Sequence, residues 1–257
     1  MLSDDELERY SRQLMLADFS IEQQERLASA SVLIVGCGGL GHPLAMYLAG
    51  AGIGRLVLAD GDRVELSNLP RQLLFRDRDL GASKAEILAR RLTEGFPAVR
   101  IEALARPVSD ETLAGDLQGI DLIADCSDNY PTRFALNRAA IAAALPLVCA
   151  SAVRAEGQLT SFHAERGTPC YRCLYPDSSQ QVALSCRESG VLGPVVGTLG
   201  ALQALEVIKL ITGWGEALLG VMLYMDLCSG SQQRLKLARR DNCPDCGDVP
   251  VFLAGDR

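Results

Sequence analysis

Histidine is nearly absent from this sequence. The chain of 257 residues contains only His42 and His163. Hydride transfer and attack by an activated serine both usually need a well-placed histidine as acid or base. We interpret His42, which falls inside an expected helix, as a packing or surface residue. The scarcity of histidine therefore disfavours both mechanisms.

Positive charge is also scarce. Lysine and arginine number 25 against 32 acidic residues, which gives a net charge of −7 and a pI of about 5.0. A chain of this charge lacks the positive field that nucleic-acid backbones attract, so we expect no nucleic-acid partner. Hydrophobic residues make up 48% and charged residues 22%, which excludes wholesale disorder.

We expect neither a targeting segment nor a membrane anchor. Four of the first eight residues are acidic, where a signal peptide needs basic residues and then an apolar run. The longest apolar stretch, 191–212, contains glycines, a proline, Glu206 and Lys209, so we expect no membrane span. These features favour a cytoplasmic location.

Strand-like and helix-like segments alternate along the first part of the chain. Helices are expected within 3–30 and at 40–51, 82–94 and 132–144; strands are expected at 31–35, 55–60, 99–104, 120–125 and 146–151. This alternation is typical of a parallel sheet with helices on both faces. Later segments predict a strand at 157–163, a helix at 195–212 and a hairpin from 218–226 and 231–237.

The expected architecture is a single α/β domain over 1–257. Its Rossmann-like mixed sheet has helices on both faces and antiparallel C-terminal strands. N-terminal helices occupy 1–30, a βαβ half occupies 31–155, and the second half covers 156–257. No internal repeat, low-complexity tract or long linker divides the chain.

A glycine-rich loop at 36–41 follows the first expected strand. Gly36, Gly38 and Gly41 fit the pattern G-x-G-x-x-G, and Asp60 lies 19 residues after Gly41. Glycines let backbone N–H groups approach a phosphate at a helix N-terminus, and the acid can bind ribose hydroxyls. The pattern predicts nucleotide binding without separating NAD from ATP.

Charged residues follow at the same expected edge of the sheet. Arg71 and Lys84 could neutralise phosphates, and Asp128 could hold magnesium. The carboxyl ends of parallel strands converge, so these side chains are expected near the glycine loop. Two cations and a metal suit a triphosphate better than a dinucleotide.

Two C-x-x-C pairs lie in the second half. Cys170, Cys173, Cys243 and Cys246 can supply the four thiolates of a tetrahedral structural zinc site. Redox-active or incidental pairs are the alternative. Nine cysteines are too few for a disulfide scaffold of this length.

The other cysteines fall into two groups. Cys37, Cys126, Cys149 and Cys228 are interpreted as buried packing residues. Cys186 stands next to an arginine in a polar segment, so it is expected to be exposed, with a thiol that could be reactive.

Together, the glycine loop, the 60–71 segment with its Ser-Asn-Leu-x-Arg-Gln, Lys84, the 125–129 segment and Cys170–Cys173 resemble the bacterial MoeB/ThiF family. This family is related to the ubiquitin-activating enzymes, and the similarity extends from Tyr10 to Cys246. It implies ATP-dependent adenylation of the C-terminal glycine of a small ubiquitin-like sulfur carrier protein that ends in Gly-Gly. It also implies magnesium, structural zinc and a homodimer.

The resemblance also implies roles for single residues. The position of Asp60 binds the ribose, those of Arg71 and Lys84 contact the phosphates, that of Asp128 engages magnesium, and that of Arg12 reaches the ATP of the partner subunit. The expected nucleotide-binding set is Gly36, Gly38, Gly39, Gly41, Asp60, Ser67, Asn68, Arg71, Lys84, Asp128 and Asn129. The expected catalytic set is Arg12, Arg71, Lys84, Asp128 and Cys186.

Two positions need comment. Pro70 stands where the family usually has glutamine; proline lacks an N–H, so the loop could differ there. Cys186 matches a family cysteine linked to a covalent carrier adduct. We expect Cys186→Ala to keep adenylation, and loss of pyrophosphate exchange in a folded variant would contradict this.

Several alternatives stay open. Residues 152–158 are slightly closer to the molybdopterin branch of the family, whereas 170–177 and 193–197 are closer to the thiazole branch; we favour the molybdopterin branch. An NAD-dependent oxidoreductase and a non-catalytic nucleotide-binding scaffold are the other two hypotheses. No rhodanese-like segment follows Cys246, so we expect a separate protein to donate the sulfur.

Overall fold

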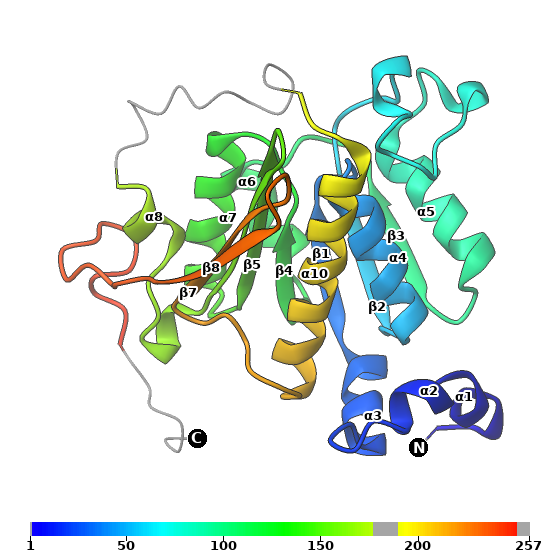
Figure 1. Ribbon diagram of the computed structural model, residues 1–257, viewed down its shortest axis with the longest axis horizontal. Helices are drawn as coiled ribbons and strands as arrows, with labels where there is room; N and C mark the ends of the chain where they lie inside the picture. The colour runs from blue at the N-terminus through cyan, green and yellow to red at the C-terminus, as the bar shows by residue number, and fades with distance from the viewer. Residues whose placement is uncertain (1, 177–189, 251–257) are drawn as a thin grey trace.

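The computed structural model describes residues 2–176 and 190–250, which build one mixed sheet of eight strands (Figure 1). The first five strands of the order are parallel, and the last three add on as antiparallel neighbours, as predicted. The spatial order is β3 (Arg100–Leu104), β2 (Arg55–Ala59), β1 (Ser31–Val35), β4 (Leu122–Asp125), β5 (Leu147–Val153), β6 (Glu156–Phe162), β7 (Val221–Asp226), β8 (Ser231–Lys236).

Helices cover both faces of the sheet, also as predicted. Alternate strand residues point to opposite faces. Val32 and Ile34 of β1 pack into one apolar cluster, and Leu33 and Val35 pack into another. The first face carries α4 (Gly41–Ala51), α5 (Lys84–Gly95) and α10 (Gly193–Thr212); the second carries α6 (Asp110–Asp116) and α7 (Tyr130–Ala142).

Three helices precede the sheet: α1 (Asp4–Arg9), α2 (Ser11–Leu14) and α3 (Ile21–Ser29). Gln13 and Gln24 both donate side-chain hydrogen bonds to the carbonyl of Ala51, at the C-terminal end of α4. The glycine loop lies at the other end of α4. The N-terminal helices therefore stand at the opposite end of the molecule from that loop (Figure 1).

Among the described residues, α10 is long and apolar enough to cross a membrane by length and composition alone. It packs against α4 and the sheet, and half of its most apolar window is buried within the fold. Its buried Glu206 accepts a hydrogen bond from the Ser161 hydroxyl at 2.9 Å and pairs with Lys209. Helix α10 is thus a core helix of this fold.

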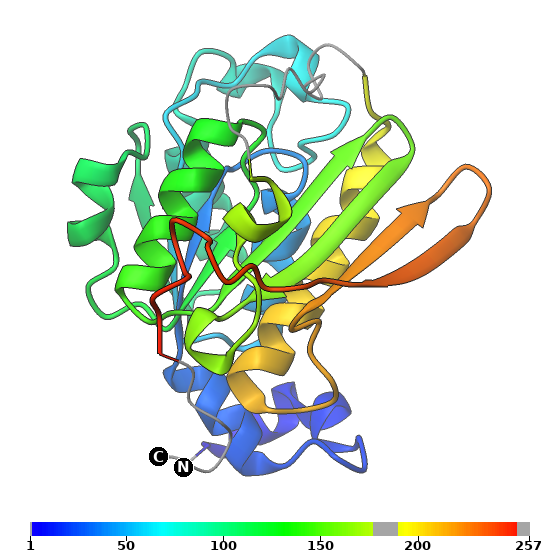
Figure 2. The same ribbon diagram turned by 90° about the vertical axis from the view of Figure 1, so that its left-hand side faces the viewer.

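Some elements differ from the sequence expectations. Helix α6 and the one-turn helix α8 (Tyr171–Leu174) were not predicted, because segments this short give little periodicity. Short 3₁₀ turns lie at Leu66–Asn68, Asp77–Asp79 and Ala164–Arg166. The prediction that Cys228 is buried is wrong: the residue is exposed in the β7–β8 turn, which projects from the body (Figure 2).

Candidate functional site

The glycine loop between β1 and α4 is closed by backbone contacts that exclude side chains. Gly36 has a positive φ of 99°, and a Cβ there would lie 2.6 Å from the Cys126 carbonyl oxygen. A Cβ on Gly41 would lie 2.1 Å from the Gly36 carbonyl oxygen. These two glycines let the loop fold tightly against the 126–127 backbone at the N-terminus of α4, where a helix favours anions.

Asp60 follows β2 and is tied to the glycine loop. Its Oδ2 accepts the N–H of Cys37 at 2.7 Å, and its Oδ1 accepts the N–H of Asp62, also at 2.7 Å. Burial raises the pKa of this carboxyl, while the two backbone bonds oppose the rise. A carboxylate has further lone pairs, so Asp60 can still accept hydroxyl groups from a ribose.

Lys84 opens α5 at the same edge of the sheet. Its side chain is buried, and its Nζ pairs with Asp62 Oδ2 at 2.9 Å. Burial, followed by the positive charge of Lys84, lowers the pKa of His42 to about 3. Neutral His42 accepts the Leu74 N–H at 3.3 Å, which confirms its interpretation as a packing residue.

The 65–72 segment folds back over the glycine loop. Asn68 is buried, and its Oδ1 accepts the N–H of Glu65 at 3.1 Å. Arg71 donates to the Ser67 carbonyl at 2.8 Å. Gln72 is buried, and its Nε2 lies 3.6 Å from the point that a Cβ on Gly38 would occupy. The motif around Arg71 is therefore beside the phosphate loop.

Pro70, the residue that departs from the family pattern, sits at an exposed turn of this segment. The turn continues past it, because Arg71 and Gln72 both donate backbone N–H bonds to the Asn68 carbonyl, at 3.1 and 3.0 Å. A missing N–H at an exposed position leaves no buried acceptor unpaired. The fold accommodates the proline.

The 125–129 segment follows β4 and presents Asp128 at the surface. Asp125, which is fully buried, accepts both the N–H and the hydroxyl of Ser127 through Oδ1, at 2.9 and 2.6 Å. Asn129 caps α7 by accepting the Thr132 N–H at 3.0 Å. Asp128 thus stands between two anchored residues.

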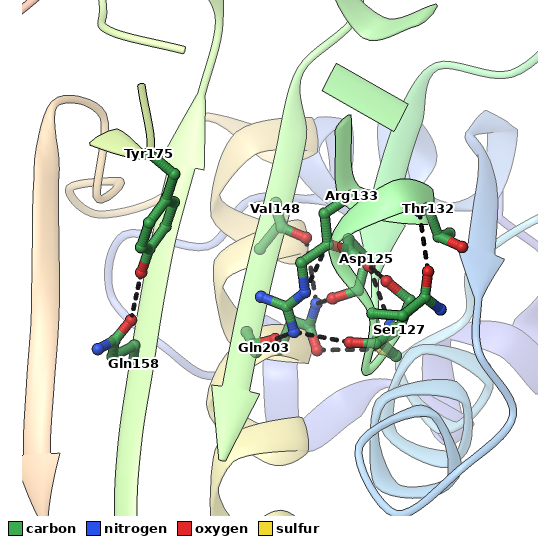
Figure 3. Close-up of polar contacts among 11 residues, drawn as sticks. Asp125, Ser127, Thr132, Arg133, Val148, Gln158, Tyr175 and Gln203 are labelled. Carbon is green, nitrogen blue, oxygen red and sulfur yellow. Dashed lines mark hydrogen bonds and ion pairs between the residues drawn. The ribbon is translucent and has the colours of Figure 1, made fainter. Parts of the chain in front are cut away.

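Two side chains that hold this segment in place were not identified from the sequence (Figure 3). Arg133 of α7 donates to the carbonyls of Ser127 and Ala150, at 2.6 and 3.2 Å. Gln203 of α10 donates to the carbonyls of Asp125 and Val148, at 2.9 and 3.1 Å. The sequence signal was a lone arginine and a lone glutamine within helices, which is common on solvated surfaces as well.

The four predicted metal-binding cysteines form one buried cluster. Their Sγ atoms all lie within 4.8 Å of one another, and three neighbouring pairs are 3.5, 3.6 and 3.9 Å apart. Four sulfurs on a tetrahedral zinc ion are about 3.8 Å apart, given a bond of about 2.3 Å. Burial raises the pKa of the Cys246 thiol. The donor set, spacing and enclosure fit zinc.

The cluster is fastened to the body of the fold. Asn137 of α7 accepts the Tyr171 N–H and donates to Asp245, both at 2.8 Å. Arg239 donates to the backbone carbonyls of Ala164 and Cys246, and so joins the turn at Ala164–Arg166 to the second C-x-x-C pair. A metal here would fix the C-terminal segment to α7 and α8 rather than take part in chemistry at the glycine loop.

The structure brings most of the predicted site residues to one edge. The glycine loop, Asp60, Lys84, the segment around Arg71 and the segment around Asp128 are connected by the contacts above. Arg12 is not among them: it is exposed on α2, beyond the opposite end of α4. Cys186 lies outside the described residues.

Comparison with known proteins gives a family. The model of the ThiF family matches residues 10–245. The mouse adenylyltransferase and sulfurtransferase MOCS3 is 47% identical over 97% of this chain and 55% of its own length, so this chain spans about half of that relative. The Escherichia coli sulfur carrier protein ThiS adenylyltransferase is 44% identical over 96% of this chain and 97% of its own length.

Solved structures agree with the sequence relatives. E. coli MccB with ATP superposes with a TM-score of 0.82 at 26% identity, over 93% of this chain and 75% of that one. E. coli MccB with MccA gives a TM-score of 0.84 at 26% identity, over 96% of this chain and 76% of that one. The sheet and its covering helices therefore follow a known arrangement.

Proposed function

The chain belongs to the ThiF family, and from that membership we propose that it adenylates the C-terminal glycine carboxylate of a small ubiquitin-like sulfur carrier protein. ATP supplies the adenylyl group and pyrophosphate leaves. The activated carboxyl is then ready for conversion to a thiocarboxylate. The names of the relatives, which include two adenylyltransferases, support this reaction.

One observation carries the proposal. The glycine loop, Asp60 and Lys84 form a continuous chain of contacts through Cys37 and Asp62. In this proposal the loop and the α4 N-terminus hold phosphates, Asp60 holds the ribose, and Lys84 and Arg71 neutralise phosphate charge. Ser67, Asn68 and Asn129 shape the walls. The nucleotide half is 31–155, and the whole chain acts as one domain.

The reaction needs no general base. A C-terminal carboxyl has a pKa of about 3.3–3.7, so it is ionised at pH 7. One carboxylate oxygen bonds to the α-phosphorus, and the bond from that phosphorus to the bridging oxygen breaks, releasing pyrophosphate with its electron pair. Lys84 exchanges Asp62 for phosphate oxygens and stabilises the charge that collects on the leaving group.

Asp128 is proposed to hold magnesium together with the phosphates. Magnesium is usually bound by one or two carboxylates plus substrate oxygens, and an exposed carboxylate at this edge meets that requirement. When bound, the ion neutralises phosphate charge.

The carrier is proposed to dock on the antiparallel part of the sheet, within 156–257. Gln158, Tyr224 and Gln233 are cross-strand neighbours on β6, β7 and β8 and share one face. Leu159 and Met225 point to the other face, which α10 covers. This row of three polar, partly exposed side chains suits a carrier that binds transiently. Strands β5 and β6 run from the row toward the nucleotide site.

A homodimer is proposed from the surface of two helices. Helices α4 and α10 pack together, and exposed apolar side chains remain on them at Met46, Tyr47 and Leu205. Such groups commonly mark protein interfaces. In a dimer, Arg12 of one subunit could reach the ATP of the other, which explains its distance from the site of its own chain. The location is proposed to be the cytoplasm.

Pyrophosphate exchange into ATP tests the function. Purified protein, magnesium and radiolabelled pyrophosphate are incubated with a molybdopterin-type or a thiazole-type carrier ending in Gly-Gly. We propose exchange with the molybdopterin-type carrier; exchange with the thiazole-type carrier alone would assign the other branch. No exchange by a protein that still binds ATP would favour the scaffold. Reduction of a nicotinamide without magnesium would favour the oxidoreductase.

The same assay bears on the sulfur donor. In the proposal, a separate sulfurtransferase or desulfurase supplies the sulfur. Thiocarboxylate should therefore form only when such a protein is added to the adenylation mixture. Thiocarboxylate formed by this chain from thiosulfate alone would contradict that part of the proposal.

A further inference from the structure

The segment that carries Asp128 is held by helices on both faces of the sheet. Arg133 reaches it from α7, and Gln203 reaches it from α10 (Figure 3). Both side chains also bond to β5, through the carbonyls of Ala150 and Val148. The end of β4 is therefore joined to the neighbouring strand β5 by side-chain hydrogen bonds as well as by the backbone pairing of the sheet.

Arg133 acts on the peptide that precedes Asp128. Its Nη2 donates to the Ser127 carbonyl at 2.6 Å, and that carbonyl belongs to the same peptide unit as the Asp128 N–H. Asp125 holds the N–H and the hydroxyl of Ser127. All three polar groups of Ser127 are thus bound, so the peptide plane leading into Asp128 has one orientation.

The energetics favour a positioning role over a stabilising one. Asp125 is fully buried, the Arg133 side chain is only 12% exposed, and their charged groups approach to 3.9 Å. A buried ion pair contributes little net stability compared with apolar residues of the same volume, because both ions lose their hydration. Its benefit here is geometric: it aims the Arg133 guanidinium at the Ser127 carbonyl.

We propose that Arg133 is a positioning residue that holds Asp128 in the geometry needed to bind magnesium–ATP. The inference rests on the magnesium role given to Asp128 in the proposed function. In this proposal Arg133 acts on Asp128 through the Ser127 peptide and not through direct contact with the metal or the nucleotide. Substitution of a residue that orients a metal ligand typically lowers metal affinity or activity by about 10–100-fold.

The test is ATP affinity, measured by calorimetry without any carrier, in magnesium and in EDTA. Arg133→Lys keeps the charge and loses the planar fork. We expect it to weaken ATP binding about tenfold in magnesium and to leave binding in EDTA unchanged. Arg138→Lys is the matched control, since Arg138 lies on the same helix and pairs with Asp110 at the surface.

A second comparison separates positioning from general damage. Adding Arg133→Lys to Asp128→Asn should cause no further loss, because the positioned group is already removed. Equal losses in magnesium and EDTA, additive losses, or no effect of Asp128→Asn would overturn the proposal. If Arg133→Lys does not fold, Ser127→Ala loosens the same segment and should show the same magnesium-specific loss.

These measurements do not depend on the carrier. If the wild-type protein shows no pyrophosphate exchange with either carrier, the proposed function fails. The magnesium-dependent difference between Arg133→Lys and Arg138→Lys would still decide whether Arg133 positions Asp128.

Discussion

At the scale of single residues, the loop at 36–41 depends on two glycines that approach the backbone of other residues. The space at Gly41 is filled by the Gly36 carbonyl oxygen. Gly50, near the far end of the same helix, has ordinary room: a Cβ there would lie 3.6 Å from the Phe96 ring. Substitution by alanine should therefore have different effects at these two glycines of the same helix.

Gly41→Ala should abolish ATP binding and lower the free energy of unfolding by at least about 2 kcal/mol, because the loop backbone must move. Gly50→Ala should keep ATP binding and raise stability by about 0.5–1 kcal/mol, because alanine favours the helix. Urea denaturation and ATP titration measure both. Equal behaviour of the two variants would contradict the tight closure of the loop.

Buried His42 gives the stability of the protein a particular pH dependence. Its pKa is lowered to about 3 by burial and by Lys84, whereas an unfolded histidine titrates near 6.5. Between these values the unfolded chain binds a proton that the folded chain does not. Stability from neutral His42 is therefore complete above pH 6.5 and is lost as the pH falls toward 3.

The slope from this one group is up to about 1.4 kcal/mol per pH unit. His42→Gln retains an acceptor for the Leu74 N–H but cannot titrate, so its stability should fall less steeply between pH 6 and 4. Denaturation curves at several pH values show the difference. Parallel curves for the two proteins would mean that His42 is protonated in the fold.

At the scale of elements, the four-cysteine cluster proposed to bind zinc joins the C-terminal segment to α7 and α8. Cys246→Ser should remove zinc and expose the 239–250 segment to proteolysis, because each of the four sulfurs completes the tetrahedral site. Metal analysis of the purified chain should give one zinc in the wild type.

Cys228→Ser is the matched control, since Cys228 is exposed in the hairpin turn. It should keep one zinc and resist protease as the wild type does. Full zinc content in Cys246→Ser would show that the cluster is not the metal site.

The parts of the fold that could be predicted from the sequence are those with local signals. The glycine loop, the buried strands and the C-x-x-C pairs each depend on spacing within a few residues. Arg133 and Gln203 could not be assigned, because their roles arise where two helices meet the end of β4 from opposite faces. Cys228 was wrongly predicted to be buried, because an apolar run, 218–226, ends just before it and the chain turns outward there.

At the scale of the whole molecule, the proposed dimer makes α4 and α10 its contact. Leu205→Glu should yield monomers in analytical ultracentrifugation, since burying an unpaired charge in an interface is costly. Leu235→Glu on β8 is the matched control, because Leu205 and Leu235 are exposed to nearly the same extent, 40% and 39%. A dimer in the first variant, or a monomer in the second, would place the contact elsewhere.

Arg12 allows a test of sharing between subunits. Chains with Arg12→Ala and chains with Asp128→Asn should each be inactive alone. Mixed dimers contain one intact site when Arg12 acts on the partner subunit, so random mixing should restore up to about a quarter of wild-type exchange. Continued inactivity after verified subunit exchange would mean that Arg12 acts within its own chain or not at all.

Adenylation itself is the central claim, and the mass of the carrier tests it most directly. A carrier ending in Gly-Gly is incubated with the protein, ATP and magnesium, and intact-protein mass spectrometry is recorded with pyrophosphatase present. We predict a carrier species heavier by one adenylyl group, absent for a carrier that lacks the last glycine. An unmodified carrier, incubated with protein that binds ATP and holds zinc, would contradict the account.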